Sequence, residues 1–114
     1  MKVSTKVIAW LKQNHSKSCA FEIKNTKGNT IPKSALKPHQ LLALQDASSS
    51  RGLVKKISDA SMTQQPFDGF QLVNVTAYVI ACFSSHGYCL VFNVDDWHGA
   101  RFDDEALFKI SLQA

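Results

Sequence analysis

Long apolar runs are missing from this sequence, and their absence excludes a class of protein. No run approaches the roughly 18 residues that a membrane-spanning helix needs, so a transmembrane protein is not expected. The N-terminal segment MKVSTKVIAWLKQNH is broken by lysines and lacks the apolar core of a signal peptide. We therefore expect a cytoplasmic protein that does not bind a membrane.

Several catalytic and nucleotide-binding motifs are also missing. The chain has no GxGxxG, GxxxxGK[ST] or GxSxG sequence, which argues against dinucleotide binding, P-loop hydrolysis and α/β-hydrolase chemistry. The four histidines show neither HxxxH nor HExxH spacing. A histidine-rich transition-metal site is therefore not expected.

Cysteine is scarce, with three residues and no CxxC pair. This count fits neither a disulfide framework nor the usual zinc sites, so Cys19, Cys82 and Cys89 are expected to be reduced core residues. One alternative stays open. If FSSHGY forms a hairpin with a four-residue loop, Cys82 and Cys89 lie opposite each other on adjacent strands, close enough to pair under oxidation.

Acidic residues are rare in the first half of the chain. Residues 1–56 contain eleven Lys and Arg but only Glu22 and Asp46, a net charge of +9, whereas residues 57–114 carry a net charge of −5. Such an uneven distribution attracts a polyanion to the basic half through its long-range field and through counterion release. Nucleic acid is the first partner to consider, and a plain solvated lysine surface is the alternative.

Length and hydrophobic spacing predict one α/β (α+β) domain over residues 1–114, with helices flanking a mixed central sheet. Apolar residues at helical spacing predict a helix that begins near Ser4 or Thr5 and ends near residue 15. SCAFEIK alternates as a strand does, NTKGNT is expected to be a loop, and Pro38 suits the first turn of a second helix that buries Leu41, Leu44 and Ala47.

The second half of the chain is expected to be mainly β-structure. LVKKI predicts a short strand and SDASMTQQP a polar loop. FDGFQLVNVTAYVIACF and YCLVFNV predict two or three strands, the last two joined as an antiparallel hairpin, and the tail predicts one more strand or a short helix.

Glu22 and Lys24 are the first candidates for chemistry. Their spacing of i, i+2 places both side chains on one face of the predicted strand. A carboxylate can hold a hard divalent cation, while an adjacent ammonium can steer a water and neutralise phosphate charge. One carboxylate does not complete a magnesium site, and no acid precedes Glu22.

Asp68 is the leading candidate for the second acid. It stands in QQPFDGFQL at the entrance to a strand, a position that suits a ligand facing a cleft and equally suits a turn residue before glycine. Asp59, in the polar loop, is the reserve candidate.

Two polar residues open the second helix. Gln40 lies close to the apolar positions Leu41 and Leu44, so its amide can reach the strand that carries Glu22 if the helix packs on that sheet. The alternative is a polar residue at the edge of the helix face. His39, likewise, is either part of the site or an ordinary surface residue at a helix start.

The stretch FEIKNTKGNTIPKSALKPHQLLAL resembles the Holliday-junction resolvases of the RecU type, within the PD-(D/E)xK nuclease superfamily. The resemblance rests on Glu22-Ile23-Lys24, the basic loop that follows, and the His39-Gln40 pair. GLVKKIS and QPFDGF are similar to small phage-encoded resolvase-like proteins, and the match covers about residues 19–95. In the superfamily the metal-binding Asp precedes Glu-x-Lys, whereas here it would come from downstream, as Asp68 in a permuted strand order.

The resemblance implies a restriction-endonuclease-like core and an Mg²⁺-dependent (or Mn²⁺-dependent) endonuclease that hydrolyses phosphodiester bonds in branched DNA, as a homodimer. Glu22, Asp68 and the carbonyl of Ile23 would bind the metal ion. Lys24 would orient the attacking water, and Gln40 would support Lys24 or the substrate. The residues expected to bind the DNA backbone are Lys27, Lys33, Lys37, His39, Lys55 and Lys56.

The symmetry of a junction suggests the homodimer, and the apolar hairpin strands are expected to provide its surface. Two other functions stay open. The first is a nuclease-fold protein that binds DNA or another protein without cutting, and the second is a structural module whose charge asymmetry docks another subunit.

Overall fold

A four-stranded mixed sheet forms the centre of the computed structural model, which describes residues 2–57 and 66–113. The strand order is β1-β5-β6-β8; β1 runs parallel to β5, and the other two pairs are antiparallel. The elements, in chain order, are α1 (Val3–Asn14), β1 (Cys19–Thr26), β2 (Thr30–Ile31), η1 (Lys33–Ala35), α2 (Pro38–Ser48), β3 (Leu53–Lys56), β4 (Gly69–Leu72), β5 (Thr76–Phe83), β6 (Tyr88–Asn93), η2 (Val94–Asp96), β7 (Ala100–Arg101) and β8 (Phe108–Ser111). The expected α+β fold with a mixed central sheet is confirmed.

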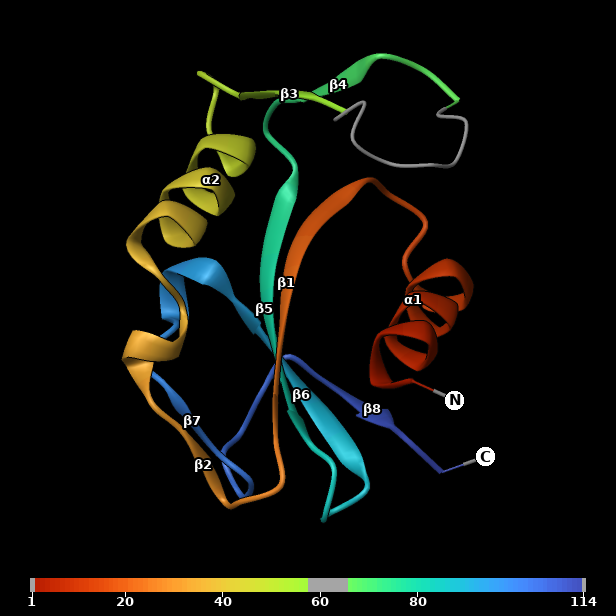
Figure 1. Ribbon diagram of the computed structural model, residues 1–114, viewed down its shortest axis with the longest axis vertical. Coiled ribbons are helices and arrows are strands. Elements are labelled where there is room, and N and C mark those ends of the chain that lie inside the picture. Colours follow the sequence, from red (N-terminus) through yellow and green to blue (C-terminus); the bar gives the residue numbers. More distant parts are fainter. Residues whose placement is uncertain (1, 58–65, 114) are drawn as a thin grey trace.

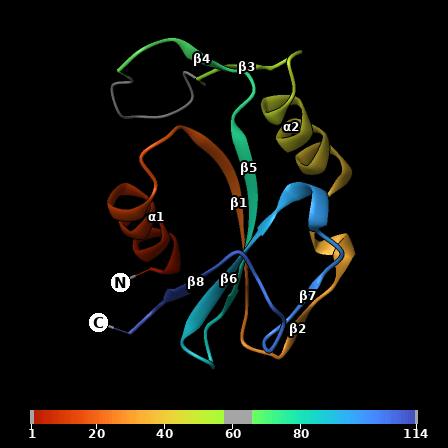
Figure 2. The ribbon, with the colours of Figure 1, turned by 180° about the vertical axis from the view of Figure 1, so that it is seen from behind.

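The two helices lie on opposite faces of this sheet (Figures 1 and 2). Strand β5 is buried on both faces, because its sequence TAYVIACF has apolar residues at nearly every position. Val79, Ala81 and Phe83 join the apolar cluster beneath α2, whereas Ile80 and Cys82 join the cluster beneath α1. The register of β1 against β5 therefore decides which face each β1 side chain occupies.

Strand β1 shows the alternation that its sequence predicts. Phe21 and Ile23 pack against the cluster beneath α1, and Ala20 packs against the cluster beneath α2. Glu22 pairs in register with Val79, so Glu22 and Lys24 share the α2 side of the sheet. The same-face prediction for this pair is confirmed.

Two small two-stranded sheets complete the fold. Strand β2 pairs with β7, and β3 pairs with β4 as a hairpin that lies apart from the central sheet (Figure 1). The loop expected at NTKGNT is shorter than predicted, because Asn25 and Thr26 continue β1 and Thr30 begins β2. Helix α1 begins at Val3, with Lys2 at the N-cap, and not at Ser4 or Thr5.

The hairpin β5–β6 places Cys82 opposite Cys89, and the two residues form a disulfide bond. The expectation of three reduced cysteines is therefore wrong for this pair, and the alternative pairing is confirmed. Cys19 has a free thiol. Cross-strand geometry brings the two sulfur atoms together on the α1 side, where both cysteines are fully buried.

The hairpin strands do not provide the apolar dimer surface that the sequence suggested. From Ala77 to Phe83 and from Cys89 to Phe92 every residue is buried within the chain. Their apolar side chains are covered by the two helices and by the connections that follow β6.

Among the described residues, no helix has the length and apolar character needed to cross a membrane.

Candidate functional site

Helix α2 carries Gln40 to the strand that bears Glu22. The helix starts at Pro38, whose missing N–H costs nothing in the first turn. Gln40 is the third helical residue, and its side-chain Oε1 accepts a hydrogen bond of 3.0 Å from the N–H of Lys37. This contact turns the amide back toward the start of the helix, where β1 passes beneath it.

Glu22, Lys24 and Gln40 form a closed triad of contacts. Lys24 Nζ donates a hydrogen bond of 2.9 Å to Gln40 Oε1, and Gln40 Nε2 donates one of 3.2 Å to Glu22 Oε1. Lys24 Nζ also lies 3.4 Å from Glu22 Oε1. The side chains of Lys24 and Glu22 are only 19% and 33% exposed, so the triad is partly buried but still in contact with solvent. Of the two possibilities left open for Gln40, the reach to the Glu22 strand is the one observed.

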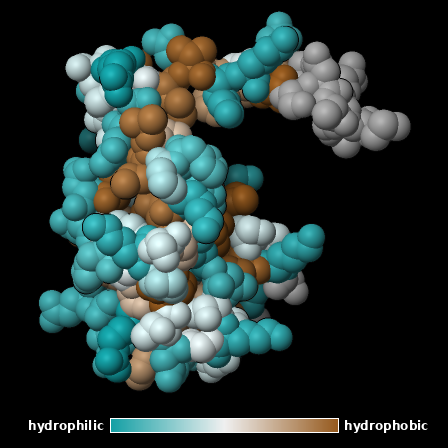
Figure 3. All heavy atoms as spheres, turned by 60° about the vertical axis from the view of Figure 1, so that its left-hand side comes forward, coloured by the Kyte–Doolittle hydropathy of each residue, from teal (hydrophilic) through white to brown (hydrophobic). Residues whose placement is uncertain are grey.

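A cavity of about 490 Å³ opens beside the triad, between β1, α2 and the β3–β4 hairpin. Its polar end is formed by Glu22, His39, Gln40 and Lys55. The remainder of its wall is apolar or small, and comprises Cys19, Ala20, Phe21, Ala43, Leu44, Leu53, Phe70 and Leu72. Figure 3 shows hydrophobic residues reaching the surface in the upper part of the molecule, beside the hairpin and α2. A ligand at this site would meet the Glu22 carboxylate and the Lys55 ammonium at one end and apolar side chains at the other.

Asp68 lies in the short bend that enters β4, as its position before Gly69 predicts. Its side chain is exposed, and its backbone carbonyl accepts a hydrogen bond of 2.8 Å from the N–H of Ile57. Phe70, two residues later, lines the cavity, but Asp68 is not among the described residues that form the cavity wall. Within residues 2–57 and 66–113, no group of three or more His, Cys, Asp and Glu side chains converges. Asp59, the reserve candidate, lies outside the described residues.

The six residues expected to bind the DNA backbone are all exposed. They come from the turn after β1, from η1, from the start of α2 and from β3. His39 and Lys55 also line the cavity, so they connect this basic surface to the triad.

A second polar group at the other face was not found from the sequence. Tyr78 Oη and His15 Nε2 lie 2.9 Å apart, and His15 Nδ1 lies 2.7 Å from the carbonyl oxygen of Lys17. Because a carbonyl only accepts, Nδ1 carries a proton, and in the neutral imidazole the tyrosine hydroxyl then donates to Nε2. Burial, followed by the charge of nearby Cys19, raises the pKa of Tyr78, and burial raises the pKa of the Cys19 thiol. His15 and Tyr78 are 63 positions apart, so no local motif could have paired them.

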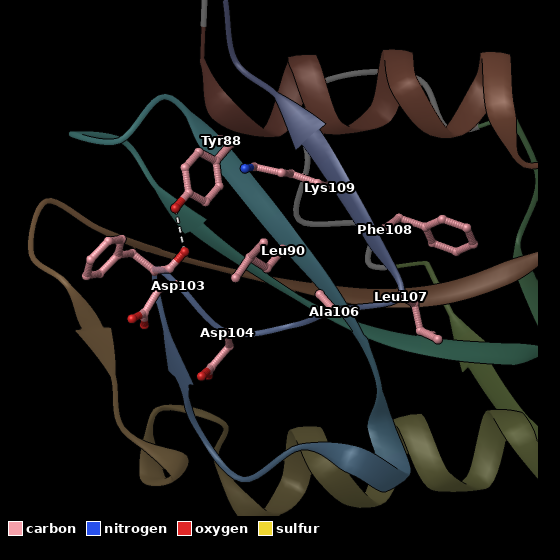
Figure 4. Close-up of a pocket in the computed structure, with 9 residues that line it drawn as sticks. Tyr88, Leu90, Asp103, Asp104, Ala106, Leu107, Phe108 and Lys109 are labelled. Carbon is pink, nitrogen blue, oxygen red and sulfur yellow. Dashed lines mark hydrogen bonds between the residues drawn. The ribbon is translucent and has the colours of Figure 1, made fainter.

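Figure 4 shows another hollow, of about 410 Å³, between β6, β8 and the turn that precedes β8. Lys109 Nζ lies 4.0 Å from the centre of the Tyr88 ring, and the Tyr88 hydroxyl donates to the carbonyl of Phe102. The two acids at its rim are engaged with Arg101: Asp103 pairs with its side chain at 3.2 Å, and Asp104 accepts from its backbone N–H at 2.8 Å. These carboxylates therefore hold the turn together.

No protein-family model matches the chain, and searches of curated proteins and of solved structures gave no significant match.

Proposed function

We propose that this protein is a metal-dependent endonuclease that hydrolyses phosphodiester bonds in branched DNA. The observation that carries the proposal is the Glu22–Lys24–Gln40 triad, in which a strand and the following helix hold a carboxylate, an ammonium and an amide within hydrogen-bond distance. These are the residues on which the resemblance to the PD-(D/E)xK resolvases rests. The parallel pairing of β1 and β5 across α2 agrees with the restriction-endonuclease-like core that the resemblance implies.

The donor chemistry fits a hard divalent cation such as Mg²⁺ or Mn²⁺, which prefers oxygen ligands. Glu22 lines the cavity, and both of its contacts in the triad use one carboxylate oxygen, Oε1. Asp68 belongs to the segment that leads directly to Phe70 in the cavity wall. As the resemblance implies, Glu22, Asp68 and the carbonyl of Ile23 would hold the ion, which requires Asp68 to turn from its exposed position toward Glu22.

A bound divalent cation would supply charge neutralisation at the scissile phosphate and a more acidic bound water. The other roles in the reaction fall to side chains of the protein. Lys24 holds its ammonium 3.4 Å from Glu22, which lines the cavity; there it would orient a water and stabilise the negative charge that develops on the phosphate. Gln40 is a positioning residue, because it fixes Lys24 through its amide oxygen and Glu22 through its amide nitrogen.

The basic residues of the first half would bind the DNA backbone without reading its sequence. Lys55 and His39 line the cavity, Lys56 ends β3, and the other three lie in a turn or at helix ends. Contacts of this kind act on phosphate charge and position the duplex.

The test is to incubate the protein with branched and with linear DNA, in the presence of Mg²⁺, Mn²⁺ or EDTA. We expect metal-dependent cleavage that falls at least about 100-fold in Glu22→Gln and in Asp68→Asn, because each variant removes a charge that the chemistry needs. Asp95→Asn is the matched control, since Asp95 is an exposed acid in η2 that belongs neither to the triad nor to the described cavity wall. Cleavage that is unchanged in both site variants would remove this assignment.

A second candidate is a nuclease-like protein that binds DNA, or another protein, and cuts neither strand. The exposed position of Asp68, outside the described cavity wall, favours it, because a single carboxylate does not complete the metal site. Fluorescence anisotropy with the same DNA substrates separates the two candidates. Tight, salt-sensitive DNA binding without cleavage products in the presence of either metal ion supports the second candidate. The absence of DNA binding would instead favour the structural module that docks another subunit.

A further inference from the structure

Strand β1 is a long edge of the central sheet. Among the described residues its only ladder partner is β5, whereas the opposite edge of the sheet is the shorter strand β8. Of the usual devices that keep an edge from pairing, β1 has no proline and no bulge, and it also lacks glycine, but it carries the charged side chains of Glu22 and Lys24. Every residue of β1 is exposed or half-buried. In Figure 1, β1 lies in front of β5.

Hollows flank the first half of this edge, from Cys19 to Glu22, on both faces of the sheet. The 490 Å³ cavity lies on the α2 side, and a second hollow of about 230 Å³ lies on the α1 side, lined by Ile8, Leu11, Lys12, His15, Lys17, Cys19 and Phe21. Cys19 and Phe21 line both hollows. The two helices therefore leave room beside this half of the strand, and among the described residues no second strand pairs with the outer edge of β1.

We propose that the edge pairs with β1 of a second copy of this chain, antiparallel, about a two-fold axis through Ile23. In this register Glu22 of each copy lies opposite Lys24 of the other. Residues directly opposite in an antiparallel pair lie on the same face with Cβ atoms about 5 Å apart, so each dimer gains two cross-strand pairs of unlike charge. The result is one continuous eight-stranded sheet with a self-complementary interface.

The charges select this register over its neighbours. The two-fold axis must be perpendicular to the sheet, so it keeps the α2 side of both copies on one face and only same-face residues can be opposed. The next register in one direction centres the axis on Glu22 and puts the two Glu22 side chains opposite each other. The next register in the other direction centres it on Lys24 and opposes two lysines. Like charges in direct opposition destabilise a strand pair.

This dimer does not require the proposed nuclease activity. Glu22 and Lys24 project from the α2 face of the sheet and not from its edge, so the pairing brings two triads together on one face. A stable dimer that cuts no DNA satisfies the inference, and a monomer that cuts DNA refutes it. The two proposals therefore fail on different observations.

Disulfide trapping tests the register. In a Cys19→Ser background, Ile23→Cys places one thiol directly opposite its copy at the two-fold axis, within reach of a disulfide. Asn25→Cys is the matched control, because it lies on the same face of β1 but about 14 Å along the strand from its copy. We expect a covalent dimer on mild oxidation for Ile23→Cys and none for Asn25→Cys. Equal trapping of both variants, or trapping of neither, would overturn the register.

Charge reversal gives a second test that does not depend on an introduced thiol. Glu22→Lys and Lys24→Glu each oppose like charges across the dimer, so each should weaken the wild-type dimer at least about tenfold in analytical ultracentrifugation. Mixing the two variants should restore association as a heterodimer, because every opposed pair is again unlike. This rescue is specific to the interface, since each chain still carries its own like-charged pair at positions 22 and 24. A wild-type protein that stays monomeric at its highest soluble concentration refutes the proposal, as does the lack of rescue in folded variants.

Discussion

Gln40 and Lys24 lie 16 positions apart in the chain and are joined by a hydrogen bond of 2.9 Å from the lysine ammonium to the amide oxygen. The same oxygen accepts from the backbone N–H of Lys37, and the amide nitrogen donates to Glu22. One side chain thus caps the start of α2 and ties that helix to β1. The position of the helix and the position of the candidate catalytic lysine are therefore coupled.

Replacing Gln40 with Ala should lower the free energy of unfolding by about 1–2 kcal/mol, because the cap and two half-buried hydrogen bonds are lost together. Urea denaturation measures the change. Gln45→Ala is the control, since Gln45 is exposed on the same helix and should shift stability little. Equal unfolding midpoints for the two variants would show that the triad adds nothing to the fold.

The basic surface makes a separate prediction about salt. Replacing Lys55 and Lys56 together with Ala should reduce the slope of log K against log salt for DNA binding by about 2, because each phosphate contact releases close to one counterion. Fluorescence anisotropy over a series of salt concentrations gives the slope. Lys109→Ala is the matched control, because Lys109 lies in the acidic half and stacks on Tyr88. A control slope that falls as much as that of the double variant would assign the effect to net charge alone.

Local chemistry in the sequence is enough to predict several elements of this fold. Pro38 marks the start of α2, since its ring suits the first helical turn and prevents the preceding residue from being helical. The alternation of β1 depends only on which side chains are apolar, so it places Glu22 and Lys24 correctly on one face. The spacing of Cys82 and Cys89 around a four-residue turn likewise gives their cross-strand position.

Other features depend on partners that are distant in the chain. Thr30 becomes a strand residue because it pairs with Arg101, and the loop composition around Gly28 gives no sign of that partner. The contact of Gln40 with β1 depends on how α2 crosses the sheet. The position of Gln40 beside Leu41 and Leu44 was compatible with this contact but did not determine it. Asp68 shows the converse: its turn position is local and was predicted, whereas its relation to the cavity depends on the hairpin, which packs apart from the central sheet.

The disulfide between Cys82 and Cys89 makes a prediction about redox state and stability. Alkylation of the unfolded, unreduced protein should modify one thiol per chain, that of Cys19, by intact mass. Reduction should lower the free energy of unfolding by about 2 kcal/mol, since the bond closes a short loop. Cys19→Ser should leave the effect of reduction unchanged. Three alkylated thiols before reduction would contradict the bond.

Cys19 should titrate at a higher pH in the folded protein than in the unfolded chain, because burial disfavours its thiolate. The rate of iodoacetamide alkylation, followed against pH in buffer and in urea, should have its midpoint at higher pH in buffer. Cys19→Ser, in which only the Cys82–Cys89 disulfide remains, is the control and should show no alkylation in either solvent. Because the folded-state pKa is the higher one, this thiol's contribution to stability is complete below the unfolded-state pKa and is lost as pH rises through the folded-state pKa. Tyr78, whose pKa is raised in the same direction, adds to the loss at alkaline pH, so Cys19→Ser should flatten the alkaline fall in melting temperature only in part.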